Sequence, residues 1–344
     1  MPLLEVVDLH TQFSTPAGIV RAVDGVSFEL DAGEVLGIVG ESGSGKTVMA
    51  LSLMRLVDPV AGRIGPGQVL LDGQDVMKMD ARQLRSMRGA GMAMIFQDPM
   101  TSLNPLQRVG RQIAESLRLH LGMGAAASRK RAIDLLSRVG IADAARRVDD
   151  YPHQFSGGQR QRVMIAIAIA CQPKVILADE MTTALDVTVQ AQIVELLRDL
   201  TTETGTSLVV ITHDMGLVAG IADRIQVMYA GVIVERGSTP AIFDMPRMPY
   251  TWGLLGSIPR PDRARRERLV PIEGSPPDLI GGFGGCRFAA RCKYTREVCL
   301  IQEPALRGAA GQPIGHVGRC WGTQEGSTGG WLARVDWRAE AGWT

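Results

Sequence analysis

A glycine-rich stretch early in the 344-residue chain has the composition of a phosphate-binding loop. It follows the apolar run Val35–Val39 and precedes a helix-like run that starts at Val48. Glycines leave room for backbone N–H groups to surround an anion, and the following helix N-terminus would point at it. Lys46 would reach the β- and γ-phosphates, and the Thr47 hydroxyl would bind Mg²⁺. A nucleotide triphosphate site is therefore predicted at Gly40, Ser42, Gly43, Ser44, Gly45, Lys46 and Thr47, since a plain tight turn would not need the preceding strand or the Lys-Thr pair.

Two adjacent carboxylates end a second apolar run. Val175–Ala178 predicts a buried parallel strand, and ligands bind at the carboxyl ends of such strands. Asp179 would hold Mg²⁺ through water, and Glu180 would orient or deprotonate the attacking water. Two buried carboxylates without cations would be costly, which favours a metal site over a purely structural acid pair.

Two further polar residues follow predicted strands. Gln97 ends the run Gly91–Phe96, where it could contact Mg²⁺ or the attacking water; in isolation it would be interpreted as a surface side chain. His213 follows the strand-like Ser207–Ile211 and could hydrogen-bond a γ-phosphate. Phe13 lies in an early strand and could either stack on an adenine or pack in the core, and both interpretations stay open.

A second helix N-terminus could hold a second anion. It would be formed by Ser156, Gly157, Gly158 and Gln159, although alone these residues could be an ordinary helix cap. Residues 163–170 follow and predict a buried helix, because the run is too long and too rich in alanine for a strand. The whole of residues 105–170 predicts a helical insertion in an α/β domain, with one apolar stripe at Val109, Ile113, Leu117 and Leu121.

The elements that position these residues begin with strands. Residues 3–39 alternate apolar and polar side chains between turn signals and predict short strands. A strand at Val69–Leu71 and a helix at Val187–Leu200 follow. Near residue 257 the composition shifts to proline, glycine and arginine, which predicts the end of the first domain.

Composition excludes several classes of protein. The net charge of +1 gives no general attraction to nucleic acid, and 45% hydrophobic residues suffice for a sizeable core. No apolar run approaches the roughly 18 residues that cross a bilayer. The N-terminus lacks the basic and apolar regions of a signal peptide, so a cytosolic chain with reduced cysteines is expected.

Taken in order, these motifs resemble those of the ATP-binding cassette ATPases: P-loop, Q-loop at Gln97, signature at Ser156–Gln159, Walker B at Asp179–Glu180, D-loop at Asp186 and switch histidine His213. The resemblance implies an α/β fold with a P-loop NTPase (RecA-like) core, an antiparallel β-subdomain, and a helical signature subdomain at about residues 98–172. In that family two cassettes pack head to tail around two ATP molecules. The residues that would then serve the nucleotide of the partner chain are Ser156, Gly157, Gly158, Gln159 and Asp186.

The resemblance also assigns roles within one cassette. It implies that Glu180, His213 and Gln97 take part in hydrolysis. Mg²⁺ would be bound by Thr47, Gln97 and Asp179, and ATP would be bound by the P-loop and Phe13.

Finer sequence narrows the resemblance to the dipeptide/oligopeptide/nickel importer ATPases. Residues 95–105 and 184–193 carry it, and it covers about residues 3–321. It implies an ATPase on the cytoplasmic face of a bacterial inner membrane, paired as a heterodimer with a second, similar but non-identical ATPase. Two permease subunits and, indirectly, an extracytoplasmic solute-binding protein would complete the importer. The alternative is a nucleotide-binding regulatory subunit with little hydrolysis of its own. Met181 stands where the family commonly has proline, which would loosen the following loop.

Four of the five cysteines lie in residues 258–321, which resemble the C-terminal extension of the same ATPases after the cassette of residues 1–257. In a reducing cytosol, clustered thiols suggest metal ligands, and their spacing does not choose the metal. The resemblance favours a [4Fe-4S] cluster over zinc, with free thiols as the remaining alternative. The proposed ligands are Cys286, Cys292, Cys299 and Cys320.

Three other segments have less distinctive sequences. Cys171 is expected to pack in the core. The arginine-rich residues 260–268 are interpreted as a solvated linker, or otherwise as a contact for acidic lipid or a partner. Residues 322–344 lie outside the resemblance and could form either a mobile tail or a short docking helix.

Overall fold

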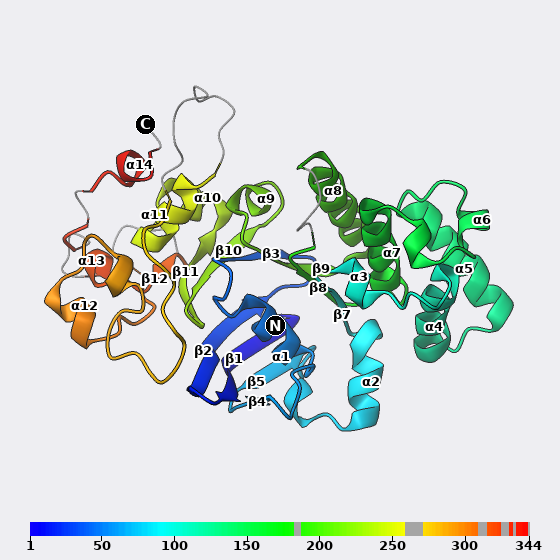
Figure 1. Ribbon diagram of the computed structural model, residues 1–344, viewed down its shortest axis with the longest axis horizontal. Coiled ribbons are helices and arrows are strands. Elements are labelled where there is room, and N and C mark those ends of the chain that lie inside the picture. The colour runs from blue at the N-terminus through cyan, green and yellow to red at the C-terminus, as the bar shows by residue number, and fades with distance from the viewer. Residues whose placement is uncertain (182–186, 259–270, 309–314, 325–329, 333–334, 343–344) are drawn as a thin grey trace. The chain divides into compact units, whose positions relative to one another are not determined.

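Segments that are far apart in the sequence come together in two units of the chain (Figure 1). The helical unit comprises residues 1–5, 29–35 and 70–211, and the P-loop unit comprises residues 6–28, 36–69 and 212–344. This computed structural model describes residues 1–181, 187–258, 271–308, 315–324, 330–332 and 335–342. Within those ranges no helix is both long enough and apolar enough to span a bilayer.

The N-terminal strands are long and joined by a tight turn. β1 spans Leu4–Thr15 and lies beside β2, Gly18–Leu30, while the short β4, Gly62–Ile64, pairs antiparallel with β1. The expectation of short strands in this region is wrong. The chain passes through left-handed conformations at Asp8 (φ 50°) and Gly25 (φ 78°) without leaving the strands, because isolated irregularities bend a strand rather than end it.

Parallel pairing places the phosphate-loop strand in the core of the P-loop unit. β3, Val35–Val39, pairs in parallel with β10, Arg224–Tyr229. β11, Val232–Ser238, continues antiparallel from β10, and β12, Val317–Gly318, pairs antiparallel with β11. Leu36, Ile38 and Val39 are fully buried, so the predicted apolar strand before the loop is confirmed. Helix α1, Lys46–Leu53, begins directly after the loop.

Short helices complete the P-loop unit. Three belong to the predicted cassette: α9, Met215–Ala219; α10, Thr239–Asp244; and α11, Pro249–Gly256. The remaining elements lie in the C-terminal part: the 3-10 turn η3, Ala289–Arg291, and the helices α12, Glu297–Ile301, α13, Trp321–Gln324, and α14, Trp337–Glu340.

The described part of the C-terminal tail packs against α11. Trp252, Leu332 and Ala341 form a buried apolar cluster, which Trp331 and Trp337 border. α14 contacts α11, and a side chain at Gly256 would clash with the backbone of Ala341. Of the two alternatives for residues 322–344, the structure therefore shows a short docked helix at Trp337–Glu340.

Three strands of the helical unit pair in parallel. β7 spans Met92–Ile95, β8 spans Val175–Asp179 and β9 spans Ser207–Thr212, in the order β9-β8-β7. All three were expected from their apolar runs, and β8 and β9 are buried along their whole length. β5, Gln68–Leu71, and β6, Gln74–Asp75, pair antiparallel.

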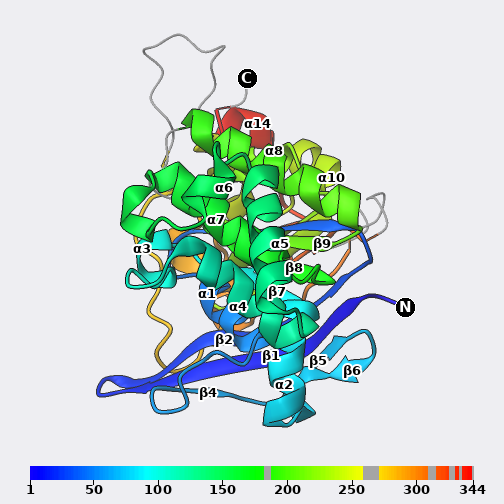
Figure 2. The ribbon, with the colours of Figure 1, turned by 90° about the vertical axis from the view of Figure 1, so that its right-hand side faces the viewer.

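Helices between β7 and β8 confirm the predicted helical insertion. α4, α5 and α7 pack against one another (Figure 2). Val109, Ile113 and Leu117 of α4 are fully buried as expected, whereas Leu121 is 50% exposed because it is the last residue of the helix. The helices and 3-10 turns of this unit are η1, Val76–Lys78; α2, Ala81–Ala90; α3, Pro99–Ser102; α4, Val109–Leu121; α5, Ala125–Arg138; α6, Ala144–Arg147; η2, Pro152–Gln154; α7, Gly157–Ile169; and α8, Val187–Thr204.

Candidate functional site

The loop between β3 and α1 requires glycine at two positions. A Cβ atom at Gly40 would lie 2.1 Å from the carbonyl oxygen of Met228, and one at Gly45 would lie 2.1 Å from that of Ala22. Gly45 also has a φ of 103°, a conformation that L-residues rarely adopt. The backbone therefore turns tightly between β3 and α1, as it does in loops whose N–H groups surround an anion.

Lys46 and Ser44 offer polar atoms inside this loop. The Lys46 side chain is buried, and its Nζ donates hydrogen bonds to the carbonyl oxygens of Gly40 (2.8 Å) and Glu41 (3.0 Å). The Ser44 Oγ atom is buried and has no hydrogen-bond partner among the described residues. Ser42 and Gly43 are exposed, and Thr47 is half-buried in the first turn of α1. A buried ammonium and an unpaired hydroxyl within an anion-binding turn fit a phosphate group.

Two other sequence-predicted residues belong to the same unit. His213 is exposed and directly follows β9, and the next residue, Asp214, caps α9 by accepting from the N–H groups of Gly216 (2.8 Å) and Leu217 (3.3 Å). Phe13 is half-buried on β1 opposite Gly62, whose lack of a side chain leaves room for the ring. Half-burial fits both core packing and stacking, so the role of Phe13 stays a prediction.

In the helical unit, the structure brings Gln97 and Glu180 together. Gln97 Nε2 donates a hydrogen bond to Glu180 Oε2 at 2.9 Å. Glu180 has a φ of 39°, and its N–H donates to the carbonyl oxygen of Ile211 at 2.8 Å. A left-handed glutamate is strained, and such strain is typical of positions where function fixes the direction of a side chain. Asp179 ends β8 with 1% exposure.

The predicted second anion site is the N-terminus of α7. Ser156 is the N-cap: its N–H donates to Gln159 Oε1 (3.1 Å), and its Oγ accepts from the Gln159 N–H at the long distance of 3.4 Å. Ser156 and Gly157 are exposed, so the end of the helix is open to an anion. Asp186 lies outside the described residues, as do residues 182–185.

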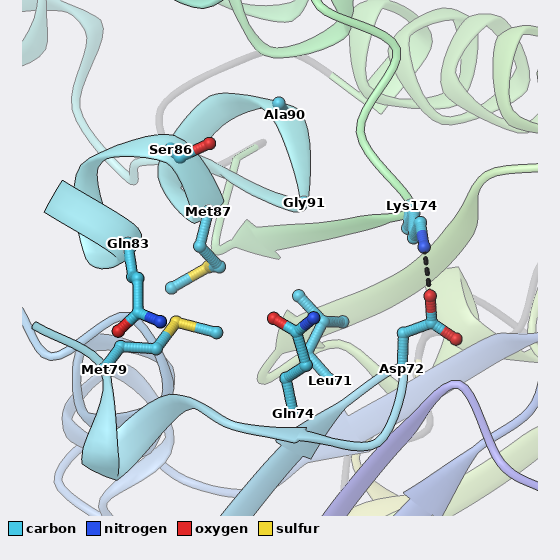
Figure 3. A pocket seen from close by; sticks show the side chains of 10 residues that line it. All are labelled: Leu71, Asp72, Gln74, Met79, Gln83, Ser86, Met87, Ala90, Gly91 and Lys174. Atoms are coloured by element: carbon cyan, nitrogen blue, oxygen red, sulfur yellow. Dashed lines mark hydrogen bonds and ion pairs between the residues drawn. The ribbon is translucent and has the colours of Figure 1, made fainter.

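A hollow in the helical unit has none of the sequence-predicted site residues in its lining. Its volume is about 360 Å³, and Figure 3 shows the side chains that line it. Met79 and Met87 give it an apolar wall, Gln74 and Gln83 add amides, and Lys174 forms an ion pair with Asp72 at one side. None of the predicted phosphate, magnesium or catalytic residues is among its lining residues.

The four C-terminal cysteines are free thiols in one part of the P-loop unit. Burial raises the pKa of Cys286 to about 11, and the neighbouring Cys299 and Cys292 add to the increase. Burial also raises the pKa of Cys320 to about 12, with Cys286 and Cys292 contributing. Among the described residues, no group of three or more histidine, cysteine or acidic side chains is arranged to hold a metal ion, so the metal site stays a prediction.

Cys171 belongs to the core, as expected. It is 7% exposed, and its Sγ donates to the carbonyl oxygen of Ser116 at 3.5 Å. Burial raises the pKa of this thiol. These contacts explain its position at the end of a buried helix through packing alone.

Sequence reasoning missed the residues that support the phosphate loop. The Tyr250 hydroxyl accepts a hydrogen bond from the N–H of Glu41 (2.7 Å), and Arg291 forms two hydrogen bonds with the Glu41 carboxylate. Burial raises the pKa of Tyr250 far above its usual range, which keeps its hydroxyl protonated. Both residues are more than 200 positions from the loop in sequence, so no local pattern could have identified them.

Two families match parts of this sequence. A match to the ABC transporter family covers residues 23–183, and a match to the C-terminal region of oligopeptide/dipeptide transporters covers residues 234–299. The oligopeptide transport ATP-binding protein OppD of Bacillus subtilis (strain 168) is 50% identical over 304 residues, which cover 88% of this chain and 85% of that protein. The dipeptide transport ATP-binding protein DppD of Escherichia coli (strain K12) is 50% identical over 306 residues, which cover 89% of this chain and 93% of that protein.

Solved structures of ATP-binding cassettes share the fold. The cassette MJ0796, in a dimeric post-hydrolysis state bound to ADP and Pi, gives a TM-score of 0.62 at 30% identity and covers 69% of this chain and 98% of that chain. The cbiO1 protein of Clostridium perfringens, part of the ABC transporter complex cbiONQ, gives a TM-score of 0.59 at 26% identity over 71% of this chain and 91% of that chain. The expected α/β P-loop fold is confirmed.

Proposed function

Because the chain belongs to the ATP-binding cassette ATPases of the peptide-importer branch, we propose that it hydrolyses ATP to ADP and phosphate and drives peptide uptake through separate membrane permeases. The observation that carries this proposal is the phosphate loop. Its two sterically required glycines, its buried Lys46 and the Ser44 hydroxyl, which has no partner among the described residues, provide the backbone and side-chain groups that a triphosphate needs.

Binding of ATP is assigned to the phosphate loop and α1. The loop N–H groups and Lys46 would neutralise the phosphates, and the hydrogen bonds that Lys46 makes to loop carbonyls would be exchanged for phosphate oxygens. Thr47, Asp179 and Gln97 would supply the oxygen ligands that Mg²⁺ prefers. Phe13 would stack on the adenine. Phosphoryl transfer depends mainly on positioning and charge stabilisation, which these groups provide.

Hydrolysis is assigned to Glu180. Its carboxylate would accept a proton from the attacking water, and the hydrogen bond from Gln97 would hold that carboxylate in place. His213 would donate a hydrogen bond to the γ-phosphate. Gln97 begins the segment that leads to α3, so its partner could change when Mg²⁺ binds and carry that change to the permeases.

The assembly that we propose contains a second, similar ATPase, two permeases and an extracytoplasmic solute-binding protein, at the cytoplasmic face of the inner membrane. Head-to-tail packing with the second ATPase would bring Ser156, Gly157, Gly158 and Gln159 to its nucleotide. The exposed N-terminus of α7 supports this role, because it offers backbone N–H groups to an anion. Asp186 would complete the same contact.

The test of ATP-driven uptake uses the complete importer in lipid vesicles. Glu180→Gln should lower phosphate release and peptide uptake by at least about 100-fold, because the general base is lost, while ATP still binds. Glu195→Gln, on the exposed side of α8, serves as the matched control and should retain both activities. Unchanged phosphate release in the Glu180 variant would reassign the base. ATP binding without hydrolysis by the intact importer would instead support the regulatory alternative.

For the C-terminal cysteines we propose a [4Fe-4S] cluster bound by Cys286, Cys292, Cys299 and Cys320. The donor type fits, because thiolates are the usual ligands of such clusters. Cys299 and Cys292 lie near enough to Cys286 to raise its pKa, and Cys286 and Cys292 lie near enough to Cys320 to raise its pKa. When bound, the cluster would cross-link four points of the C-terminal segment. The cluster would lie beside η3 and α12, because Cys292 ends η3 and Cys299 belongs to α12.

Metal analysis of the anaerobically purified chain tests this cluster. We expect about four iron and four sulfide per chain, with loss of both in Cys292→Ser. Cys171→Ser, which removes the one cysteine outside the group, should retain them. Stoichiometric zinc without sulfide would identify a zinc site instead. A chain with neither metal would overturn the proposal.

A further inference from the structure

Glu41 is the second residue of the phosphate loop, and every polar group of its backbone and side chain forms a hydrogen bond. Its N–H donates to Tyr250 Oη, and its carbonyl oxygen accepts from Lys46 Nζ and from the N–H of Ser44. Both carboxylate oxygens accept from Arg291, Oε2 from Nη1 at 2.6 Å and Oε1 from Nη2 at 2.9 Å. The position of Glu41 is therefore set by the C-terminal half of the P-loop unit as well as by the loop.

Arg291 uses all five of its guanidinium N–H donors in this arrangement. Besides the two bonds to Glu41, Nη1 donates to Tyr229 Oη (3.3 Å), Nη2 to the carbonyl oxygen of Ile272 (3.3 Å), and Nε to that of Glu273 (2.9 Å). Its side chain is 4% exposed. A buried guanidinium with no unpaired donor is rigidly oriented, so the carboxylate that it binds is rigidly oriented too.

Aromatic rings fill the space between the phosphate loop and the segment that carries Arg291. Tyr229 and Tyr250 have ring centroids 4.5 Å apart, and Phe288 lies 5.4 Å from each. Arg291 follows Phe288 on the 3-10 turn η3 and directly precedes Cys292. The turn that positions Arg291 is thus flanked by Cys286 and Cys292, two of the four clustered thiols.

The ion pair between Arg291 and Glu41 affects the electrostatics of nucleotide binding. A carboxylate one residue after Gly40 would repel a triphosphate bound in the same loop, and the repulsion would be poorly screened because the Glu41 side chain is only 26% exposed. A bidentate guanidinium cancels that charge and holds the carboxylate in one direction. Removing the guanidinium alone would leave an uncompensated charge beside the phosphates.

We propose that the cysteine-containing extension is part of the nucleotide site: Arg291 is a positioning residue that neutralises and orients Glu41 so that the phosphate loop can accept ATP. The inference rests on the proposed ATP-binding function. It assigns to the extension a direct influence on ATP affinity, because the turn between Cys286 and Cys292 also sets the position of Arg291. Any event that displaces this turn would reach Glu41 directly through Arg291, and through Phe288 by way of Tyr250.

Equilibrium titration of the purified full chain with a fluorescent ATP analogue tests the proposal. Arg291→Met should raise the Kd by about tenfold or more, the effect of one poorly screened charge. Arg296→Met is the matched control, because Arg296 is exposed, lies over the Trp331 ring at 4.2 Å and should leave the Kd unchanged. Arg291→Lys, which keeps the charge but not the fork, should fall between Arg291→Met and the unsubstituted chain.

A charge-cancelling double variant separates positioning from simple structural support. If Arg291 acts by neutralising Glu41, Glu41→Gln combined with Arg291→Met should restore the Kd to within about threefold of the unsubstituted chain, since no charge then faces the phosphates. A Kd that does not change in Arg291→Met overturns the proposal, as does a double variant that folds but shows no rescue. If Arg291→Met does not fold, the Lys variant and the double variant decide in the same way. Failure of the unsubstituted chain to bind ATP would instead reject the proposed function.

Discussion

Steric fit decides which residues the phosphate loop can contain. The Cβ position of Gly45 lies against a backbone carbonyl oxygen, so a side chain does not fit there. The Lys46 ammonium donates hydrogen bonds to two carbonyl oxygens of the loop. These restrictions come from the backbone of β2 and β10, to which Ala22 and Met228 belong. Within the motif, steric contacts restrict Gly40 and Gly45, whereas no atom of the described residues lies within 4 Å of the place that a Cβ of Gly43 would occupy.

Gly45→Ala should therefore abolish detectable ATP binding. Its Cβ would approach Ala22 O to 2.1 Å at a φ of 103°, so the loop must move and its N–H groups would no longer converge. Gly33→Ala is the control, because Gly33 also has a positive φ (76°), but no atom of the described residues lies within 4 Å of the place that its Cβ would occupy. Calorimetric titration with ATP compares the two variants, and normal binding by Gly45→Ala would contradict the steric argument.

A buried acid joins elements of the P-loop unit. Glu235 of β11 is fully buried and accepts hydrogen bonds from the N–H groups of Arg247 (2.6 Å) and Met248 (3.0 Å), the hydroxyl of Thr251 (2.6 Å) and Nε2 of His316 (2.9 Å). It thereby accepts hydrogen bonds from backbone N–H groups at the start of α11 and fixes the position of His316, which precedes β12. One carboxylate thus connects the cassette with the extension.

Glu235→Ala should lower the free energy of unfolding by about 3–5 kcal/mol, because four donors lose their partner in a buried site. Urea denaturation followed by tryptophan fluorescence measures the change, since Trp252 lies on α11 itself. Glu195→Ala, on the exposed side of α8, should change stability by no more than about 0.5 kcal/mol. Equal stability of the two variants would show that the network contributes little.

The candidate residues of the whole molecule are divided between its two units. The phosphate loop and His213 belong to the P-loop unit, whereas Gln97, Asp179, Glu180 and the N-terminus of α7 belong to the helical unit. Under the proposed head-to-tail packing, the N-terminus of α7 would serve the nucleotide of the second cassette, whereas Gln97, Asp179 and Glu180 would serve the nucleotide of their own chain. A variant at the N-terminus of α7 should then lower ATP hydrolysis by the assembly without changing ATP binding by the isolated chain.

Ser156→Ala should reduce ATP hydrolysis by the complete importer at least about tenfold, through loss of a phosphate contact, while the isolated chain binds ATP unchanged. The structural cost should be small, because its cap hydrogen bond is long at 3.4 Å. Ser238→Ala removes a cap of the same length at α10 and should leave turnover intact. Equal loss of turnover in both variants would mean that Ser156 acts only as a helix cap.

The sequence by itself determined the candidate site residues that lie close together along the chain. Gly40–Thr47, Ser156–Gln159 and Asp179–Glu180 are contiguous motifs at the ends of strands or helices, and their elements follow from apolar runs that the fold buries. The docked tail was not determined, because it depends on packing partners remote in sequence. The length of β1 and β2 was not determined either, because the strands continue through the left-handed residues Asp8 and Gly25.

Only the tertiary structure decided the long-range contacts of the phosphate loop and of the buried Glu235. Glu41 meets Tyr250 and Arg291 across 209 and 250 residues, and Glu235 meets His316 across 81 residues. None of these pairs follows a period of 2 or 3.6 residues, so periodicity gives no signal for them. They form because a buried polar group without a hydrogen-bond partner is energetically costly. The topology determines which partner lies within hydrogen-bond distance.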